Sequence, residues 1–351
     1  MLNLRIFYEG QEIDRFTSGT GALAFHFHPG NRLSLKIIGS AFITDEQESY
    51  DILGEYWIDQ LDNGAVQGRD SALNLGVGTY LNHARNNLLA NVYSLQHKGT
   101  FIVGNNQLKW GIVYKKEIID DEINEWDFID SVGYSIPYTG NRVSLFDTRI
   151  GNNTLATNRL EAYFQNTFTF LTSLGSINFT TGIRSSYWDY NNQVTVSPRL
   201  SASYRPGGNH NISYKAAFGI YHQPPFYKEL RDQTGLLYQD VKAQESYHYV
   251  LGSDYTFMAG NNPFKLSAEV YYKYYDHLIP YKLDNIRIQY YPQFNARGYA
   301  TGVEVKLNGD FVPGTQSWLS LSLLQTKEDV IGDYYFKDRY VVRYTPYGRF
   351  L

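Results

Sequence analysis

Apolar and polar residues alternate with a period of two along most of this chain. Between Lys265 and Tyr275, one face carries Leu266, Ala268, Val270, Tyr272 and Tyr274, and the other carries Lys265, Ser267, Glu269, Tyr271 and Lys273. This pattern is typical of a β-strand with one apolar and one polar face. The same alternation returns in 159–170, 199–205, 211–220, 303–308 and 319–323. Because no comparable stretch shows the spacing of an amphipathic helix, we expect an almost all-β protein.

Short turns and long polar connections follow one another in strict alternation. The turn signals, rich in Gly, Asn and Pro, are Pro29-Gly30-Asn31, Gly104-Asn105-Asn106, Leu174-Gly175-Ser176, Gly207-Gly208-Asn209, Gly260-Asn261-Asn262 and Pro313-Gly314-Thr315. Gly and Asn tolerate the positive φ that tight hairpins need. Longer connections are predicted near 45–86, 119–158, 189–194, 223–244, 279–297 and 328–337. In an up-and-down meander this order places every tight turn at one end.

The pattern predicts about fourteen strands, several of them long enough to cross a bilayer at a tilt. They lie near 2–9, 20–28, 32–44, 87–103, 107–118, 159–172, 177–188, 195–206, 210–222, 245–259, 263–278, 298–311, 316–327 and 338–347. Short turns at one end, long loops at the other and alternating faces together indicate an antiparallel up-and-down transmembrane β-barrel of a Gram-negative outer membrane. A soluble β-sandwich or propeller is the alternative, but no blade-length repeat and no linker-like boundary is found.

Composition agrees with a surface that meets both lipid and water. The chain of 351 residues has 32 Tyr, 20 Phe and 5 Trp, and Tyr is the aromatic residue with one polar end. A net charge of −4 argues against a nucleic-acid binder, and the absence of Cys excludes disulfides and thiolate sites. No apolar run is long enough for a transmembrane helix, and the start of the chain lacks the pattern of a signal peptide.

Candidate sites for metals and catalysis are weak. His26 and His28 share one face of a strand, but no third ligand can be placed with them. Six acidic residues fall in the predicted connection 119–158, without the spacing of a calcium loop: Asp120, Asp121, Glu122, Glu125, Asp127 and Asp130. There is no nucleophile elbow and no phosphate-binding glycine motif. We therefore predict no metal site, no cofactor and no catalytic residue.

The connection 223–244 is the best candidate for ligand contact. It combines rings and cations in Tyr227, Lys228, Arg231 and Tyr238, as ligand-binding surfaces do, although packing over the barrel mouth explains the same residues. The polar strand faces should point into the lumen, and their charged members are Arg199, Arg205, Lys215, Glu269, Lys273, Glu304 and Lys306.

Several stretches resemble the barrels of TonB-dependent outer-membrane receptors of the Bacteroidetes type. They are Ser197-Pro-Arg-Leu-Ser-Ala-Ser-Tyr204, Gly219-Ile-Tyr-His-Gln-Pro-Pro-Phe226, Ala243-Gln-Glu-Ser-Tyr-His-Tyr-Val-Leu-Gly252, Glu269-Val-Tyr-Tyr-Lys-Tyr-Tyr-Asp276 and Gly298-Tyr-Ala-Thr-Gly-Val-Glu304. The likeness covers about residues 159–328 and carries no information about the substrate.

The resemblance implies a barrel of about 22 strands whose lumen holds a plug. Such receptors import an extracellular ligand with energy delivered by TonB, so the implied partners are outer-membrane lipid, a plug domain, TonB through that plug, and an unidentified ligand. We expect residues 1–351 to form one partial barrel domain, an open wall without plug or signal peptide, and no binding to nucleic acid. A passive porin, an outer-membrane adhesin and a barrel enzyme such as a lipase are the alternatives; the enzyme requires a Ser–His pair in hydrogen-bond reach.

Overall fold

The computed structural model describes residues 2–61, 72–130, 144–208, 211–260, 262–284, 287–312, 315–337 and 340–343. A single sheet of twelve strands dominates these residues. Its members are β1 (Leu2–Gly30), β2 (Leu33–Leu61), β3 (Ala72–Val103), β4 (Asn106–Asp130), β5 (Asp147–Thr172), β6 (Gly175–Trp188), β7 (Gln193–Pro206), β8 (Ile212–Gln223), β9 (Gln244–Ala259), β10 (Asn262–Leu278), β13 (Ala296–Val312) and β14 (Thr315–Val330). The remaining elements are the 3₁₀ turn η1 (Tyr227–Leu230) and two hairpins, β11 (Tyr281–Asp284) with β12 (Arg287–Tyr290) and β15 (Tyr334–Lys337) with β16 (Tyr340–Arg343).

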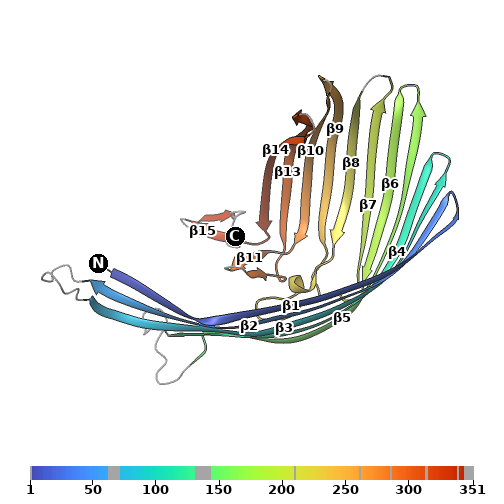
Figure 1. Ribbon diagram of the computed structural model, residues 1–351. Coiled ribbons are helices and arrows are strands. Elements are labelled where there is room, and N and C mark those ends of the chain that lie inside the picture. The colour runs from blue at the N-terminus through green and yellow to red at the C-terminus, as the bar shows by residue number, and fades with distance from the viewer. Residues whose placement is uncertain are drawn as a thin grey trace.

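The sheet is an antiparallel meander in which each strand pairs with the next one along the chain. It curves into a wall with a concave and a convex side (Figure 1). Within the described residues, the tight turns lie at one end of the strands, and the longer connections lie at the other. Gly104 and Gly260 have φ values of 55° and 63°, the left-handed geometry that such turns need. The predicted fold class and the alternation of short and long connections are confirmed.

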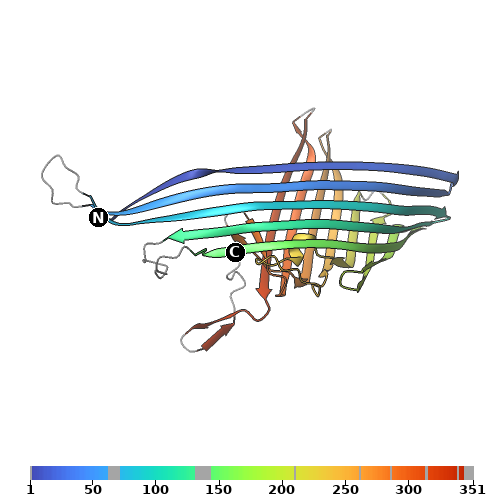
Figure 2. The ribbon, with the colours of Figure 1, turned by 90° about the horizontal axis from the view of Figure 1, so that it is seen from below.

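The strands fall into two groups of different length, which the sequence did not predict. Strands β6 to β14 of the wall have 12–17 residues, whereas β1 to β5 have 25–32. The long strands run side by side far past the others (Figure 2). Much of the connections predicted at 45–86 and 119–158 is therefore strand, because their polar residues pair across strands, as Arg85 does with Asp51.

Two predicted strand boundaries are also wrong. The strands expected near 2–9 and 20–28 form the single strand β1, and Gly19 and Gly21 within it do not interrupt the pairing with β2. The last predicted strand, near 338–347, does not join the wall where it is described. Residues 340–343 pair instead with 334–337, and 338–339 and 344–347 lie outside the described residues.

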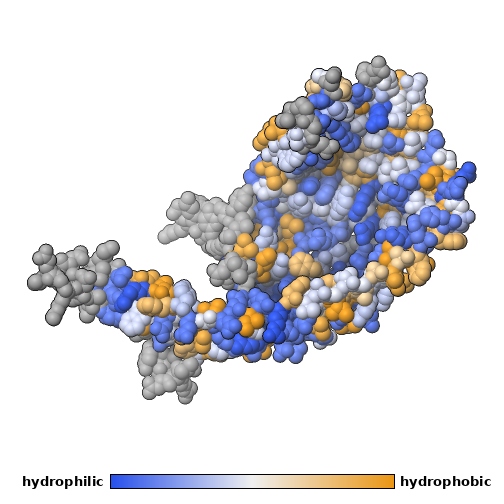
Figure 3. Space-filling view, in the orientation of Figure 1, coloured by the Kyte–Doolittle hydropathy of each residue, from blue (hydrophilic) through white to orange (hydrophobic). Residues whose placement is uncertain are grey.

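Apolar side chains form continuous rows across the convex face of the wall. Leu266, Leu307 and Leu319 lie in register on β10, β13 and β14, and so do Val270, Val303 and Leu323. Most of these are exposed, with Leu319 at 66% and Leu323 at 64% of their full accessibility. The hollow of the wall is largely hydrophilic (Figure 3). The alternation in the sequence thus gives the wall one apolar and one largely polar face, which suits a wall with lipid outside and water inside.

The sheet is open along both edges. Within the described residues, β1 pairs only with β2 and β14 only with β13, so the two ends of the sheet are not joined. The expectation of an open wall is thus confirmed. No helix in this part of the chain is long and apolar enough to cross a membrane.

Candidate functional site

A small hydrophobic core lies on the concave side of the wall, between the sheet and the segments that rest on it. Residues 224–243, which we call the inner segment, leave β8, form η1 and rest on the concave side of the long strands (Figure 1). The core combines the wall residues Ile119, Leu155 and Trp188 with Tyr227, Leu230 and Val241 of this segment. Ile279, which directly follows β10, completes it. Leu230 is completely buried. An exposed loop would bury no such side chains, so the inner segment is a packed part of the fold.

Buried polar contacts fix the inner segment to β4 and β5. The Tyr227 hydroxyl donates to Asp121 Oδ2 at 2.7 Å, and the Arg231 guanidinium donates to the same oxygen at 2.6 Å. Burial and the hydrogen bond to Asp121 raise the pKa of Tyr227 far above its usual value. Asn153 Nδ2 donates to Gly235 O at 2.9 Å, where φ is +89°. Asp121 is therefore the main anchor of the segment.

The four residues predicted to contact ligand have different surroundings. Tyr227 and Arg231 are tied to Asp121, and the Tyr238 hydroxyl donates to Asp232 within the segment at 3.1 Å. Lys228 is half exposed and its ammonium lies 3.3 Å from the Glu46 carboxylate. For Tyr227 and Tyr238 the contacts favour the packing role over ligand contact, whereas Lys228 and Arg231 also line a cavity.

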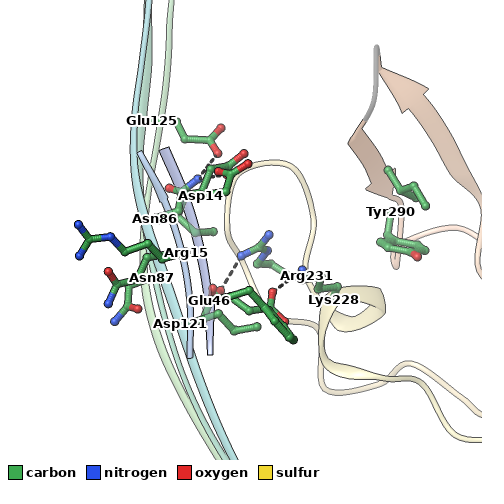
Figure 4. A pocket seen from close by; sticks show the side chains of 16 residues that line it. Asp14, Arg15, Glu46, Asn86, Asn87, Asp121, Glu125, Lys228, Arg231 and Tyr290 are labelled. Atoms are coloured by element: carbon green, nitrogen blue, oxygen red, sulfur yellow. Dashed lines mark hydrogen bonds and ion pairs between the residues drawn. The ribbon is translucent and has the colours of Figure 1, made fainter. Parts of the chain in front are cut away.

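That cavity, of about 500 Å³, lies between the inner segment and the concave side of the long strands (Figure 4). Three parts of the chain that are far apart in sequence surround it: β1 to β4, the inner segment and β12. Its lining includes Asp14, Phe16, Glu46, Glu48, Asn86, Leu88, Asp121, Ile123, Glu125, Lys228, Arg231, Ile288 and Tyr290. Arg15 and Asn87 also belong to this region, but their side chains point away from the hollow (Figure 4).

The wall side of the cavity is acidic and internally ordered. Asn86 donates through its amide nitrogen to Glu48 Oε2 at 2.9 Å and to Glu125 Oε1 at 2.7 Å. Its own oxygen accepts the backbone N–H of Asn124 at 3.2 Å. Sequence reasoning missed these residues because it placed 45–86 and 119–158 in loops. Their alternation along strands was the signal that could have revealed a shared face.

The acidic residues between Asp120 and Asp130 were also expected in a connection, but they lie on a strand. These residues lie on β4 and alternate between its two faces, so they do not converge on one ion.

The histidine pair near the start of the chain has a polar partner. His26 donates to or accepts from Ser34 Oγ at 2.8 Å, and its ring centroid is 4.1 Å from that of His28. Among the described residues, the carboxylates close enough to share a metal are Glu12, Asp14 and Glu48.

A Ser–His–Glu arrangement exists where the sequence suggested none. Ser197 Oγ lies 3.0 Å from His222 Nδ1, and His222 Nε2 lies 3.4 Å from Glu245 Oε1. Ser197 is only 4% exposed and sits within paired β7, next to Pro198, which has no N–H. A nucleophile needs access to substrate and free donors for the oxyanion. This geometry provides neither, so the arrangement stabilises the β7–β9 region.

Comparison with known proteins gives one decisive match. A family model described as TonB dependent receptor-like, beta-barrel, matches residues 3–347. The chain belongs to this family of TonB-dependent receptor barrels. The match extends well beyond residues 159–328, where the sequence motifs carried the resemblance. No curated protein matches the chain significantly.

Three solved structures of similar shape are distant in sequence. The copper transporter OprC is 10% identical with a TM-score of 0.50, and 92% of this chain aligns with 57% of OprC. The RagAB peptide importer is 12% identical with a TM-score of 0.49, and 95% of this chain aligns with 38% of the RagAB chain. The siderophore receptor PirA from Pseudomonas aeruginosa is 13% identical with a TM-score of 0.48, and 95% of this chain aligns with 63% of PirA. This chain thus spans between 38% and 63% of the length of these transporters and receptors.

In this receptor barrel, the charged residues predicted for the lumen share one face by register. Glu269 lies directly opposite Glu304, and Ser267 lies opposite Lys306. Lys215 and Lys265 both form ion pairs with Asp254. The other predicted residues are distributed as follows: Arg199 over the ring of Tyr221 at 4.3 Å, Lys273 over that of Tyr271 at 4.9 Å, Lys306 over that of Trp318 at 5.3 Å, and Arg205 opposite Ser176. Most of these charges therefore have partners within the wall.

Proposed function

We propose that this protein is an outer-membrane receptor of Gram-negative bacteria that binds an extracellular ligand and imports it with energy supplied through TonB. The observation that carries the proposal is the wall itself, with apolar rows on the convex face and a hydrophilic hollow, in a chain that belongs to the receptor family. The convex face would contact outer-membrane lipid. The hollow would hold a plug domain, through which TonB acts.

The same proposal treats residues 1–351 as a single barrel-wall domain. Strands β1 and β14 leave one edge each without a described partner strand. In hydrocarbon each unsatisfied backbone group costs several kcal/mol, so a wall that spans the membrane needs further strands to complete it. The long connections and the cavity would face the outside of the cell, and the tight turns would face the periplasm.

Cysteine labelling on intact cells tests this topology, because the chain contains no cysteine of its own. Lys242, an exposed residue of the inner segment, and Asn105, in a tight turn, provide two sites for single substitutions. Lys242→Cys should react with a membrane-impermeant maleimide on intact cells, whereas Asn105→Cys should react only after permeabilisation. Labelling of Asn105→Cys from outside would overturn the proposed orientation.

Bilayer conductance separates a receptor from a porin without knowledge of the ligand. A full-length receptor whose lumen is plugged should show no steady conductance in a planar bilayer, whereas a porin conducts continuously. An adhesin is distinguished by uptake: any ligand that binds should accumulate in cells that have TonB and not in cells that lack it. Accumulation without TonB would contradict energised import.

A further inference from the structure

A row of residues in register crosses the concave face of five neighbouring short strands. Val270 of β10 is on the convex face, so Lys273, an odd number of positions away, is on the concave one. Residues that pair in register share a face of the sheet. The row that contains Lys273, which we call the cationic row, consists of Arg199 of β7, Gly219 of β8, His248 of β9, Lys273 of β10 and Ala300 of β13.

No carboxylate lies beside the cationic row on these strands. The concave positions two residues nearer the long connections are Ser197, Tyr221, Ser246, Tyr275 and Gly298, and those two residues nearer the tight turns are Ser201, Ala217, Val250, Tyr271 and Gly302. Glu269 and Glu304 are four positions from the row, about 13 Å along the strand. Within the described residues, Arg199 and Lys273 form no ion pair, and Arg199 Nε is buried without a hydrogen-bond partner. The wall therefore leaves the positive charge of this row unpaired.

Two tyrosine rings orient the cations without neutralising them. The Arg199 guanidinium lies 4.3 Å from the centre of the Tyr221 ring, and the ring centroids of Tyr221 and His248 are 4.4 Å apart. The Lys273 ammonium lies 4.9 Å from the centre of the Tyr271 ring. A cation over an aromatic face is held by the ring quadrupole and keeps its full charge. Less ordering of these side chains is therefore required when an anion binds.

The cationic row lies in the part of the wall that is closer to the long connections. Lys273 is nearer to Leu278, where β10 ends before such a connection, than to the tight turn at the start of β10. His248 is nearer to Gln244, which follows the inner segment, than to the tight turn at the end of β9. Because the proposed topology turns the long connections outward, a solute that enters from outside meets this row before it reaches the tight-turn end.

The spacing of the cations selects the kind of anion. A guanidinium presents parallel N–H donors that match a carboxylate or a phosphate, and an ammonium adds a compact positive charge. The backbones of β7 and β10 are three strand intervals apart, about 14 Å, and the residues between Arg199 and Lys273 include Gly219, which has no side chain to block the surface. Two or more anionic groups on one molecule are therefore needed to use both cations.

We propose that the cationic row binds a small organic anion that carries two or more carboxylate or phosphate groups, with Arg199 and Lys273 as the residues that hold it. This inference rests on the proposed function, since it names the chemical class of ligand that the receptor takes up from outside. A hollow lined locally by one sign of charge raises the concentration of solutes of the opposite sign, which favours such a ligand over neutral ones.

The test measures binding of citrate and of tripolyphosphate to the full-length protein in non-ionic detergent by titration calorimetry. Wild type should bind at least one of them saturably, and the preferred anion distinguishes a carboxylate from a phosphate site. The affinity should fall as salt rises from 0.01 to 0.1 M, because the attraction is screened over about 10 Å at the higher concentration. The double variant Arg199→Gln/Lys273→Gln removes two charge-assisted contacts and should bind about tenfold more weakly or worse.

Lys265→Gln is the matched control. Lys265 lies on the same face of the same strand as Lys273, but its ammonium is 3.3 Å from the Asp254 carboxylate, which Lys215 also contacts. The variant makes the same change of charge at a paired site and should bind either anion within about twofold of wild type. If the double variant does not fold, Lys273→Gln alone should still weaken binding about threefold or more, since it breaks no ion pair of the wall.

Three results overturn the inference: wild-type affinity in the double variant, an equal loss in Lys265→Gln, or no saturable binding of either anion by wild type. The last is the result expected if carboxylates of the plug occupy the cationic row. Calorimetry in detergent requires no transport. Anion binding without TonB-dependent accumulation would therefore contradict only the proposed function, and TonB-dependent accumulation of another ligand by a protein that binds neither anion would contradict only this inference.

Discussion

The wall hairpin of β13 and β14 and the inner segment use large apolar side chains in opposite ways. On the hairpin, Leu319, Leu321 and Leu323 point outward and remain more than 60% exposed. In the inner segment, Leu230 is completely buried against residues of the wall. The first arrangement is favourable only where lipid covers it, and the second is the ordinary burial of a water-soluble core. One chain thus contains apolar side chains that its own fold leaves uncovered and apolar side chains that its own fold buries.

The largest expected effect comes from removing the ring at the centre of the inner core. Trp188 is 2% exposed, its indole N–H donates to Thr157 Oγ1, and the Arg159 guanidinium lies 3.9 Å from its ring. Trp188→Ala should cost about 3–5 kcal/mol of local stability, because it leaves a cavity that the surrounding strands cannot fill. Hydrogen exchange of residues 224–243 should rise sharply while β13 and β14 stay protected. Equal loss of protection in both regions would mean that they fold as one unit.

A charge on the lipid side should affect the other region. Val305 lies in register between Ala268 and Leu321 on the convex face. Val305→Arg should lower the free energy of unfolding in lipid vesicles by about 2–4 kcal/mol if the residue lies near the bilayer midplane. Glu304→Arg is the control on the concave face, and it should cost little because Glu304 already faces the like charge of Glu269. If the two variants cost the same, the assignment of the faces is wrong.

The wall was predictable from the sequence because its signal is local. Alternation of residues such as Val303, Glu304 and Val305 sets the face of each side chain, and Gly–Asn pairs mark the turns. The long strands were harder. Polar pairs such as Arg85 with Asp51 stabilise the extensions of these strands. Polar residues at successive positions, as in 45–51, hide the alternation that marks a strand and make these stretches resemble polar loops.

The inner segment was recognised as a candidate site, but its role could not be derived from the sequence. Its anchor Asp121 is 106 residues from Tyr227 and 110 from Arg231, and a contact at such separation leaves no periodic trace. The cavity has the same origin, since β1 to β4, the inner segment and β12 meet only in the folded chain.

A smaller effect is expected from the hydrogen bond between Tyr227 and Asp121. Tyr227→Phe removes a donor to a buried carboxylate, so the inner segment should lose about 1.5–3 kcal/mol, measured as the change in its hydrogen-exchange protection. Burial and Asp121 raise the pKa of Tyr227, so the folded state holds this proton more tightly than the unfolded state does. The contribution is complete below the unfolded pKa of about 10 and is lost as pH rises above it. Tyr227→Phe should therefore remove part of the alkaline loss of protection, and an unchanged alkaline profile would contradict the buried donor.

The smallest effect on stability should come from Lys228, a half-exposed residue of the inner segment. Its ammonium lies 3.3 Å from Glu46, but the side chain is half exposed, and ion pairs of this kind contribute about 0–1 kcal/mol. Lys228→Ala should therefore leave the hydrogen exchange of residues 224–243 nearly unchanged, unlike Trp188→Ala and Tyr227→Phe. Loss of protection comparable to that of Tyr227→Phe would show that Lys228 is a structural anchor.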